Sequence, residues 1–157
     1  MSKEQAEQEY EYPIGLSIRY PKDIKQEDVQ GETIKSTWVV LFGDNFDLWI
    51  SSFARTSNFP REGYYEIETK NILNKDPEAE IMGTSQHKFS TFEIEFMHFR
   101  TDNCLSGDKC NGYSAGIFSY KDYTFQIQVG EHLASTSTTE DFISEGTKAI
   151  LNSLEMK

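Results

Sequence analysis

Hydrophobic and polar residues alternate along much of this chain, which is the period of a strand with one buried face. In the clearest run, Phe92, Ile94 and Phe96 fall on one side, while Glu93 and Glu95 fall on the other. Runs of this kind predict strands over residues 12–20, 34–42, 46–53, 87–100, 113–120 and 123–129.

Two of the connections between these strands have hairpin chemistry. Gly43-Asp44-Asn45 separates strands 34–42 and 46–53, and glycine and asparagine tolerate the positive φ of tight turns. Lys121-Asp122 leaves only two residues between the last two strands, which is typical of a tight hairpin. Strands joined by such short turns pair antiparallel, so most of the sheet is expected to be antiparallel.

Two other segments have helical spacing. Residues 62–74 place Tyr64, either Ile67 or Glu68, and Ile72 on one stripe, which predicts a helix.

The second helix is predicted near the C-terminus. There, Ser137-Thr138-Thr139-Glu140 matches the capping-box pattern that opens helices. Apolar or small residues then recur at helical spacing at Phe142, Ile143, Gly146, Ile150 and Leu154.

The order of elements predicts one α+β domain rather than alternating βαβ units. A chain of 157 residues has the size of a single domain, and we place that domain at residues 10–157. Residues 1–9 are charged and polar without periodicity, which predicts a disordered acidic arm.

The charge balance narrows the classes of partner. The chain has 26 acidic and 15 basic residues and a formal net charge of −11. This field repels phosphate backbones, so nucleic-acid binding is not expected, and it favours a protein partner with a basic surface. No apolar run approaches the ~20 residues of a membrane helix, so no transmembrane segment is expected.

The two cysteines lie in one polar loop, Cys104-Leu105-Ser106-Gly107-Asp108-Lys109-Cys110. The central turn allows the thiols to meet, so we predict a disulfide, which favours an oxidising compartment. The alternative is a pair of free thiols on a loop.

Two loops rich in aspartate and asparagine could hold a hard cation, and the cysteine loop is a better candidate than Asp44-Asn45-Phe46-Asp47. Asp102, Asp108 and Asn111 supply the oxygen ligands that calcium prefers. Turn chemistry also explains these residues, and the spacing does not match an EF-hand. No other cofactor is indicated.

We find no pattern that indicates an enzyme. Nucleophilic catalysis needs a nucleophile, a base and a group that orients the base, and the sequence arranges none of its histidines in such a motif. His98 continues the apolar side of its predicted strand, and His87 and His132 lie at strand ends. Glu93 and Glu95 share a strand face and could act as a carboxylate pair in acid–base catalysis. A solvent-exposed strand face also explains them.

Exposed aromatic residues would form a partner surface. Tyr120 and Tyr123 flank the predicted two-residue turn, and Tyr113 begins the same hairpin. Tyrosine hydroxyls require water or a partner, so these three residues are the candidate contacts.

Three phrases of the sequence resemble the PsbP-like superfamily, which includes lumenal photosystem proteins, bacterial lipoproteins and a protein that binds the Ran GTPase. They are Tyr20-Pro21-Lys22-Asp23, the segment from Gly112 to Val129, and Ile150-Leu151-Asn152-Ser153-Leu154. Ile24 departs from the pattern, since the family often has tryptophan there. The resemblance implies an antiparallel sheet with helices on both sides, and it carries no catalytic motif.

The resemblance and the predicted disulfide together suggest a non-enzymatic binding or assembly module in an extracytoplasmic space. The soluble domain of a membrane-anchored lipoprotein is one form of this hypothesis. The alternative is a cytosolic acidic protein, such as an inhibitor or immunity factor, that masks a basic partner.

Overall fold

The computed structural model describes the protein over residues 7–12, 16–21, 25–27, 35–42, 46–54, 62–101, 111–120, 123–133 and 142–156. The strands in these ranges are β1 (Glu7–Tyr12), β2 (Leu16–Pro21), β3 (Lys25–Glu27), β4 (Lys35–Phe42), β5 (Phe46–Ala54), β6 (Glu80–Lys88), β7 (Glu93–Arg100), β8 (Gly112–Tyr120), β9 (Tyr123–Glu131) and β10 (Glu155–Met156). The helices are α1 (Tyr64–Lys75) and α2 (Glu145–Asn152).

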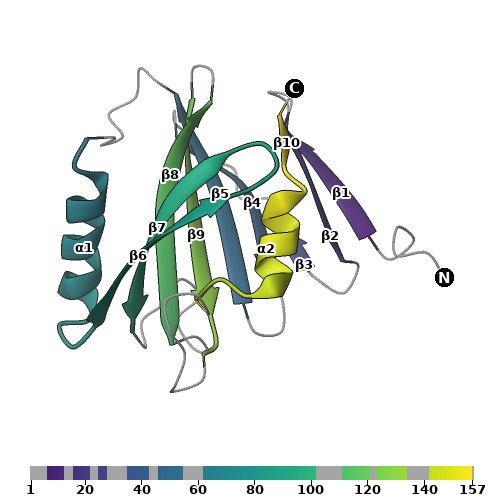
Figure 1. Cartoon of the computed structure of the whole chain (residues 1–157). Helices are drawn as coiled ribbons and strands as arrows, with labels where there is room; N and C mark the ends of the chain where they lie inside the picture. Colours follow the sequence, from purple (N-terminus) through teal and green to yellow (C-terminus); the bar gives the residue numbers. More distant parts are fainter. Residues whose placement is uncertain are drawn as a thin grey trace.

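Seven strands form one large sheet in the order β3-β4-β5-β9-β8-β7-β6 (Figure 1). A second, three-stranded sheet has the order β1-β2-β10. All recorded pairs of neighbouring strands are antiparallel, so the prediction of an antiparallel α+β fold is confirmed. The tight hairpin is also confirmed, because Tyr120 pairs with Tyr123 at its closed end.

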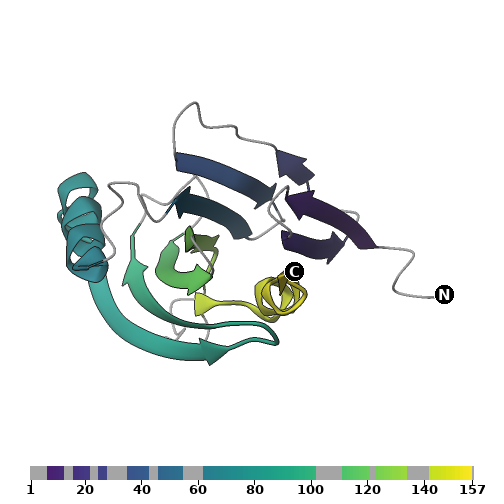
Figure 2. The ribbon, with the colours of Figure 1, turned by 90° about the horizontal axis from the view of Figure 1, so that it is seen from above.

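The two helices cover opposite faces of the large sheet, as the family resemblance implied. Phe96 of β7 belongs to the apolar cluster that contains Ile150 of α2. The next residue, Met97, belongs to the cluster that contains Ile72 of α1. Successive side chains of a strand point to opposite faces, so the two clusters lie on opposite sides. Figure 2 shows α2 inside the curve of the sheet and α1 outside it.

Helix α1 buries Tyr64, Glu68 and Ile72, while Ile67 is 40% exposed. Of the two alternatives in the stripe predicted from the sequence, Glu68 is therefore the buried residue and Ile67 is not. Within the described ranges, neither helix has the length and apolar character that a membrane crossing requires.

Residues 87–100 were predicted as one strand, but they turn back between β6 and β7. The backbone N–H of Phe89 donates to the carbonyl of Phe92 at 2.8 Å, and both rings are buried. The sequence did not indicate this turn, because the buried aromatic residues on both sides of it look like a continuation of the strand. Thr91 fixes the turn to the C-terminal segment by donating to the Leu154 carbonyl at 2.7 Å.

The predicted start of the last helix is wrong. Helix α2 begins at Glu145, its N-cap is Ser144, and Phe142 and Ile143 precede it. The Glu131 carboxylate of β9 accepts hydrogen bonds from the Ser144 N–H at 3.0 Å and the Thr147 hydroxyl at 2.9 Å. This contact from a distant strand sets the start of the helix, while residues 134–141, including the expected capping box, lie outside the described ranges.

The N-terminal boundary also differs from the one predicted. Strand β1 begins at Glu7 and pairs with β2, so residues 7–9 belong to a strand. Residues 1–6 of the predicted arm lie outside the described ranges.

Candidate functional site

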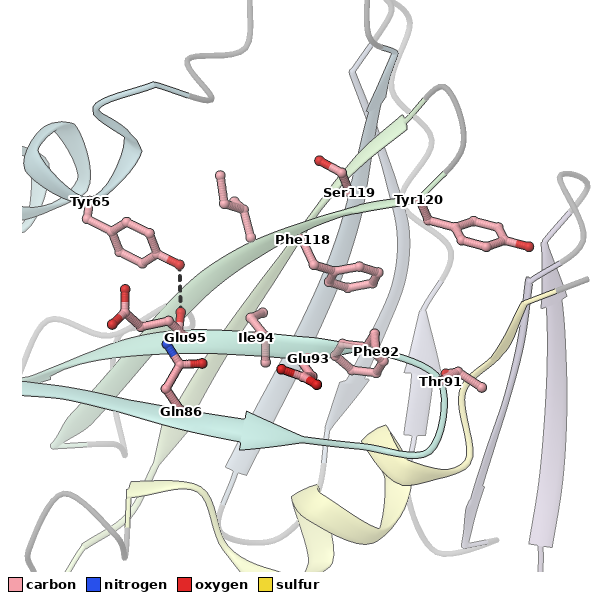
Figure 3. Close-up of a pocket in the computed structure, with 11 residues that line it drawn as sticks. Tyr65, Gln86, Thr91, Phe92, Glu93, Ile94, Glu95, Phe118, Ser119 and Tyr120 are labelled. Carbon is pink, nitrogen blue, oxygen red and sulfur yellow. Dashed lines mark hydrogen bonds between the residues drawn. The ribbon is translucent and has the colours of Figure 1, made fainter.

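A cleft opens in the large sheet where β7 and β8 separate (Figure 3). The two strands pair from Arg100–Gly112 to Met97–Ala115, and the recorded pairing ends there. Beyond that point, residues 93–95 and 117–120 line a cavity of roughly 370 Å³. The opening thus lies between two strands that are neighbours in the sheet.

Tyr65 of α1 bridges the two strands at the start of the opening. Its hydroxyl donates to the Glu95 carbonyl at 2.7 Å, and the Tyr65 hydroxyl oxygen accepts a hydrogen bond from the backbone N–H of Ile117. Continuing the antiparallel register would place Glu95 opposite Ile117. The phenol therefore occupies the position of the next step of the ladder. Burial raises the pKa of Tyr65, so the hydroxyl keeps its proton.

Gly116 allows β7 to pass close beneath β8 as the strands separate. A Cβ atom at this position would lie 2.5 Å from the Glu95 carbonyl oxygen and 2.9 Å from Cγ1 of Ile94. Neither distance is tolerable for a side chain, and the closer contact is with backbone. Glycine is thus required here by a close approach of two chains.

The cleft combines aromatic rings with an acidic rim. Phe92 and Phe118 stack with ring centroids 4.4 Å apart. Glu93 is exposed and Glu95 is half-buried, and both line the opening. Glu93 forms an ion pair with Lys88 at 3.9 Å, and both side chains are largely exposed. Such a pair contributes about 0–1 kcal/mol, so the carboxylate remains accessible to a partner.

The three candidate tyrosines have different environments. Tyr120 lines the cleft (Figure 3). Tyr123, which pairs with it, is half-buried with its ring 6.2 Å from that of Phe125. Tyr113 needs a correction, because only 2% of it is exposed and its hydroxyl donates to Glu68. It lies in the interior on the α1 face and does not belong to an exposed surface.

The predicted disulfide and calcium site fall largely outside the described residues. Cys104, Cys110, Asp102 and Asp108 all lie in residues 102–110. Asn111 is described, and its side-chain oxygen accepts from the Leu133 N–H at 2.6 Å while its amide donates to the Leu133 carbonyl at 2.9 Å. This residue thus fixes the end of the loop, and calcium binding stays a prediction.

No other metal site is evident in the described ranges. They contain no group of three histidine, cysteine, aspartate or glutamate side chains that could hold a metal ion.

A chain of hydrogen bonds ties the histidines into the sheet. Ser85 contacts His87 Nε2 at 2.8 Å and His98 Nε2 at 2.6 Å, and His98 Nδ1 contacts Ser114 at 2.6 Å. Burial, and then the nearby His87, lower the pKa of His98 to about 4. The ring is therefore neutral at pH 7, with one nitrogen donating and the other accepting. These contacts to hydroxyls satisfy a core histidine and join β6, β7 and β8.

Comparisons with known proteins bear on the fold. No family model matches the chain, and no curated protein matches it. The solution structure of cyanobacterial PsbP (CyanoP) from Synechocystis sp. PCC 6803 is similar, with a TM-score of 0.59, 12% identity, and coverage of 97% of this chain and 93% of that one. This chain has the PsbP-like fold.

A second similar structure supports this fold assignment. It is a protein from Bacteroides thetaiotaomicron, with a TM-score of 0.52 and 13% identity. The match covers 95% of this chain but 48% of that one. At these identities the likeness concerns the PsbP-like fold alone, so the residues of the cleft must be argued from their own geometry.

Sequence reasoning did not show how two residues, Gly116 and Tyr65, shape the cleft in this PsbP-like fold. An isolated glycine within a strand pattern, such as Gly116, is a signal of close backbone approach. Tyr65 gave no comparable signal, because its contact with Glu95 joins residues 30 positions apart.

Proposed function

We propose that this domain is a non-catalytic binding or assembly module of an extracytoplasmic compartment, and that it contacts a basic protein partner at the cleft between β7 and β8. The cleft carries this proposal. It places two carboxylates, Glu93 and Glu95, beside the rings of Phe92, Phe118 and Tyr120. Aromatic rings supply large contact areas, and carboxylates around them select basic groups.

The charge of the whole chain supports the same kind of partner. A net charge of −11 attracts a basic protein over several ångströms and accelerates its association at low salt. The exposed side chain of Ser119 adds a polar hydroxyl to the opening. Binding is therefore expected to weaken as ionic strength rises.

The proposed binding site can be tested with a photo-crosslinking amino acid at Ser119, in cells that normally produce the protein. We expect a crosslink to a basic protein. The Glu93→Lys/Glu95→Lys variant should reduce the crosslink about tenfold, because two exposed attractions become repulsions. The control, Glu62→Lys/Glu78→Lys, makes the same change in net charge at exposed positions outside the cleft. An equal loss in both variants would exclude the cleft as the contact site.

The compartment is tested by the midpoint potential of Cys104 and Cys110, measured by thiol labelling across a graded redox buffer. A midpoint below about −300 mV is typical of a structural disulfide and supports the extracytoplasmic proposal. Failure to form the disulfide would favour the alternative, a cytosolic inhibitor or immunity factor that masks a basic enzyme.

A further inference from the structure

Strand β6 is an edge of the large sheet. Its pairing with β7 determines which of its backbone N–H and C=O groups point outward. It stands last in the strand order, and Figure 2 shows it on the outer rim. The bond from the Phe89 N–H to the Phe92 carbonyl makes Ser85–Phe96 a hydrogen-bonded pair, because such pairs recur at every second residue. The N–H and C=O groups of Thr84 and Gln86 therefore point away from β7.

An apolar groove runs beside this edge, between β6 and α1. Its floor consists of the side chains that β6 and β7 turn toward α1, namely Ile81, Thr84, Met97 and Phe99. Tyr65, Thr69 and the neighbouring charged residues of α1 form its wall. The groove has a volume of roughly 430 Å³.

Ile81 marks the mouth of the groove. Its side chain is 60% exposed, although it sits beside a buried floor. The regular edge begins just after it, because a bulge interrupts the register between Ile81 and Gly83, where Gly83 has a φ of 111°. The usable edge therefore covers Thr84 to Lys88.

We propose that an extended peptide segment of a partner adds to the edge of β6 and inserts one apolar side chain into the groove between β6 and α1. This groove opens at a different place from the cleft between β7 and β8, although Tyr65 lines both. An added strand uses main-chain hydrogen bonds for affinity, while a pocket that receives alternate side chains gives specificity. Both parts are present here, since Thr84 belongs to the edge and also lines the groove.

The charges around the groove indicate the composition of that peptide. Glu66 and Lys70 both line the groove, so their charges offset each other. The exposed Glu80, which immediately precedes Ile81 on β6, adds a negative charge at that end of the edge, in a chain whose net charge is −11. The opposite end of the edge carries Lys88. A basic residue near the apolar anchor therefore complements the Glu80 end, which makes a basic and apolar peptide the expected occupant.

The test uses ¹⁵N-labelled protein and three hexapeptides that are acetylated at the N-terminus and amidated at the C-terminus. Each peptide has lysine at position 1 and leucine, phenylalanine or methionine at position 3. All other positions are threonine. We expect at least one peptide to shift the amide signals of Thr84 and Gln86 and to slow their hydrogen exchange. Methylating one peptide nitrogen that faces β6 should weaken binding about fivefold, as expected for one lost hydrogen bond. Serine in the third position should also weaken it.

Two exposed isoleucines provide matched variants of the protein. Ile81→Lys should abolish peptide binding, because it replaces an apolar contact at the mouth of the groove with a charge that repels the lysine of the peptide. Ile67→Lys should leave binding unchanged, because Ile67 is 40% exposed on α1 and does not line the groove. Both variants should fold, since neither side chain is buried.

Three results would overturn the proposal. They are no shift at Thr84 or Gln86 with any of the peptides at millimolar concentration, equal effects of the two isoleucine variants, and protection of the edge by self-association without peptide. The Glu93→Lys/Glu95→Lys variant should bind the peptides as well as the charge-matched Glu62→Lys/Glu78→Lys variant does, which separates failure of this site from failure of the cleft.

Discussion

The two faces of the large sheet are held by different forces, and the face beneath α2 is the apolar one. Phe96, Phe125 and Ile127 are completely buried there, and Phe118 stacks on Phe125 with centroids 5.3 Å apart. Side chains from both sheets and from α2 form one continuous cluster. Burial of apolar area is the main favourable term in folding, so this face supplies most of the stability.

The face beneath α1 relies instead on hydrogen bonds between side chains. The Tyr113 hydroxyl donates to Glu68 and accepts from the Gln128 amide at 2.8 Å. The Gln126 amide donates to the Tyr64 hydroxyl at 2.7 Å. A smaller apolar cluster accompanies these contacts.

The difference shows that the two faces of the sheet contribute in different ways to the stability of the fold and to the position of helix α1. Apolar packing is not directional, whereas a hydrogen bond fixes two groups in one relative orientation. Helix α1 needs a fixed position, because Tyr65 bridges the cleft and also lines the groove beside β6. We infer that the α2 face stabilises the fold, while the α1 face positions the two proposed binding sites.

The largest expected effect compares neighbours in β9 that point to opposite faces. Phe125→Ala removes a completely buried ring and should cost about 3–5 kcal/mol of unfolding free energy. Gln126→Ala removes the hydrogen bond to Tyr64 and should cost about 1–2 kcal/mol. Urea unfolding of both variants measures the difference. Similar losses would mean that the two faces do not differ in the way described.

The next effect concerns His98, the polar residue inside the apolar face. Its pKa is lowered to about 4 from an ordinary 6.5, so the unfolded chain binds the proton more readily. Stability is therefore complete above pH 6.5 and falls as the pH decreases toward 4. The loss should reach about 3 kcal/mol, from a shift of this size. Unfolding measured between pH 7 and pH 4 tests this.

Two variants test whether the pH dependence of stability arises from His98. His98→Gln keeps a donor and an acceptor for Ser85 and Ser114 but does not titrate, so most of the slope should disappear. His132→Gln makes the same substitution at an exposed histidine and is the matched control. Burial, and then Lys148, also lower the pKa of His87, so a small slope of the same sign should remain in His98→Gln. A full slope in that variant would contradict the assignment.

Much of the fold could be predicted because its signals are local. The β8–β9 hairpin follows from two residues between two alternating runs, and α1 from the spacing of Tyr64, Glu68 and Ile72. The errors arose where distant contacts override local ones. Ser144 became the N-cap of α2 because Glu131, 13 residues away, accepts its N–H.

The candidate site was less predictable for the same physical reason. The sequence singled out Tyr120 and the pair Glu93 and Glu95, and all three line the cleft. It could not show that β7 leaves β8 after Met97, because Tyr65 of α1, a residue far away in the sequence, takes the place of the next step of the ladder. Alternation predicts which way a side chain points, but not whether two strands stay paired.

The smallest effect tests whether hydrogen bonds hold the α1 face. Tyr113→Phe leaves the buried Glu68 carboxylate without a donor and should cost about 2 kcal/mol. Glu68→Met removes the other partner. If the pair acts as a unit, the double variant should lose less than the sum of the single losses, by about 1 kcal/mol in urea unfolding. Additive losses would show that the two groups act independently, and α1 would then be positioned by its apolar contacts alone.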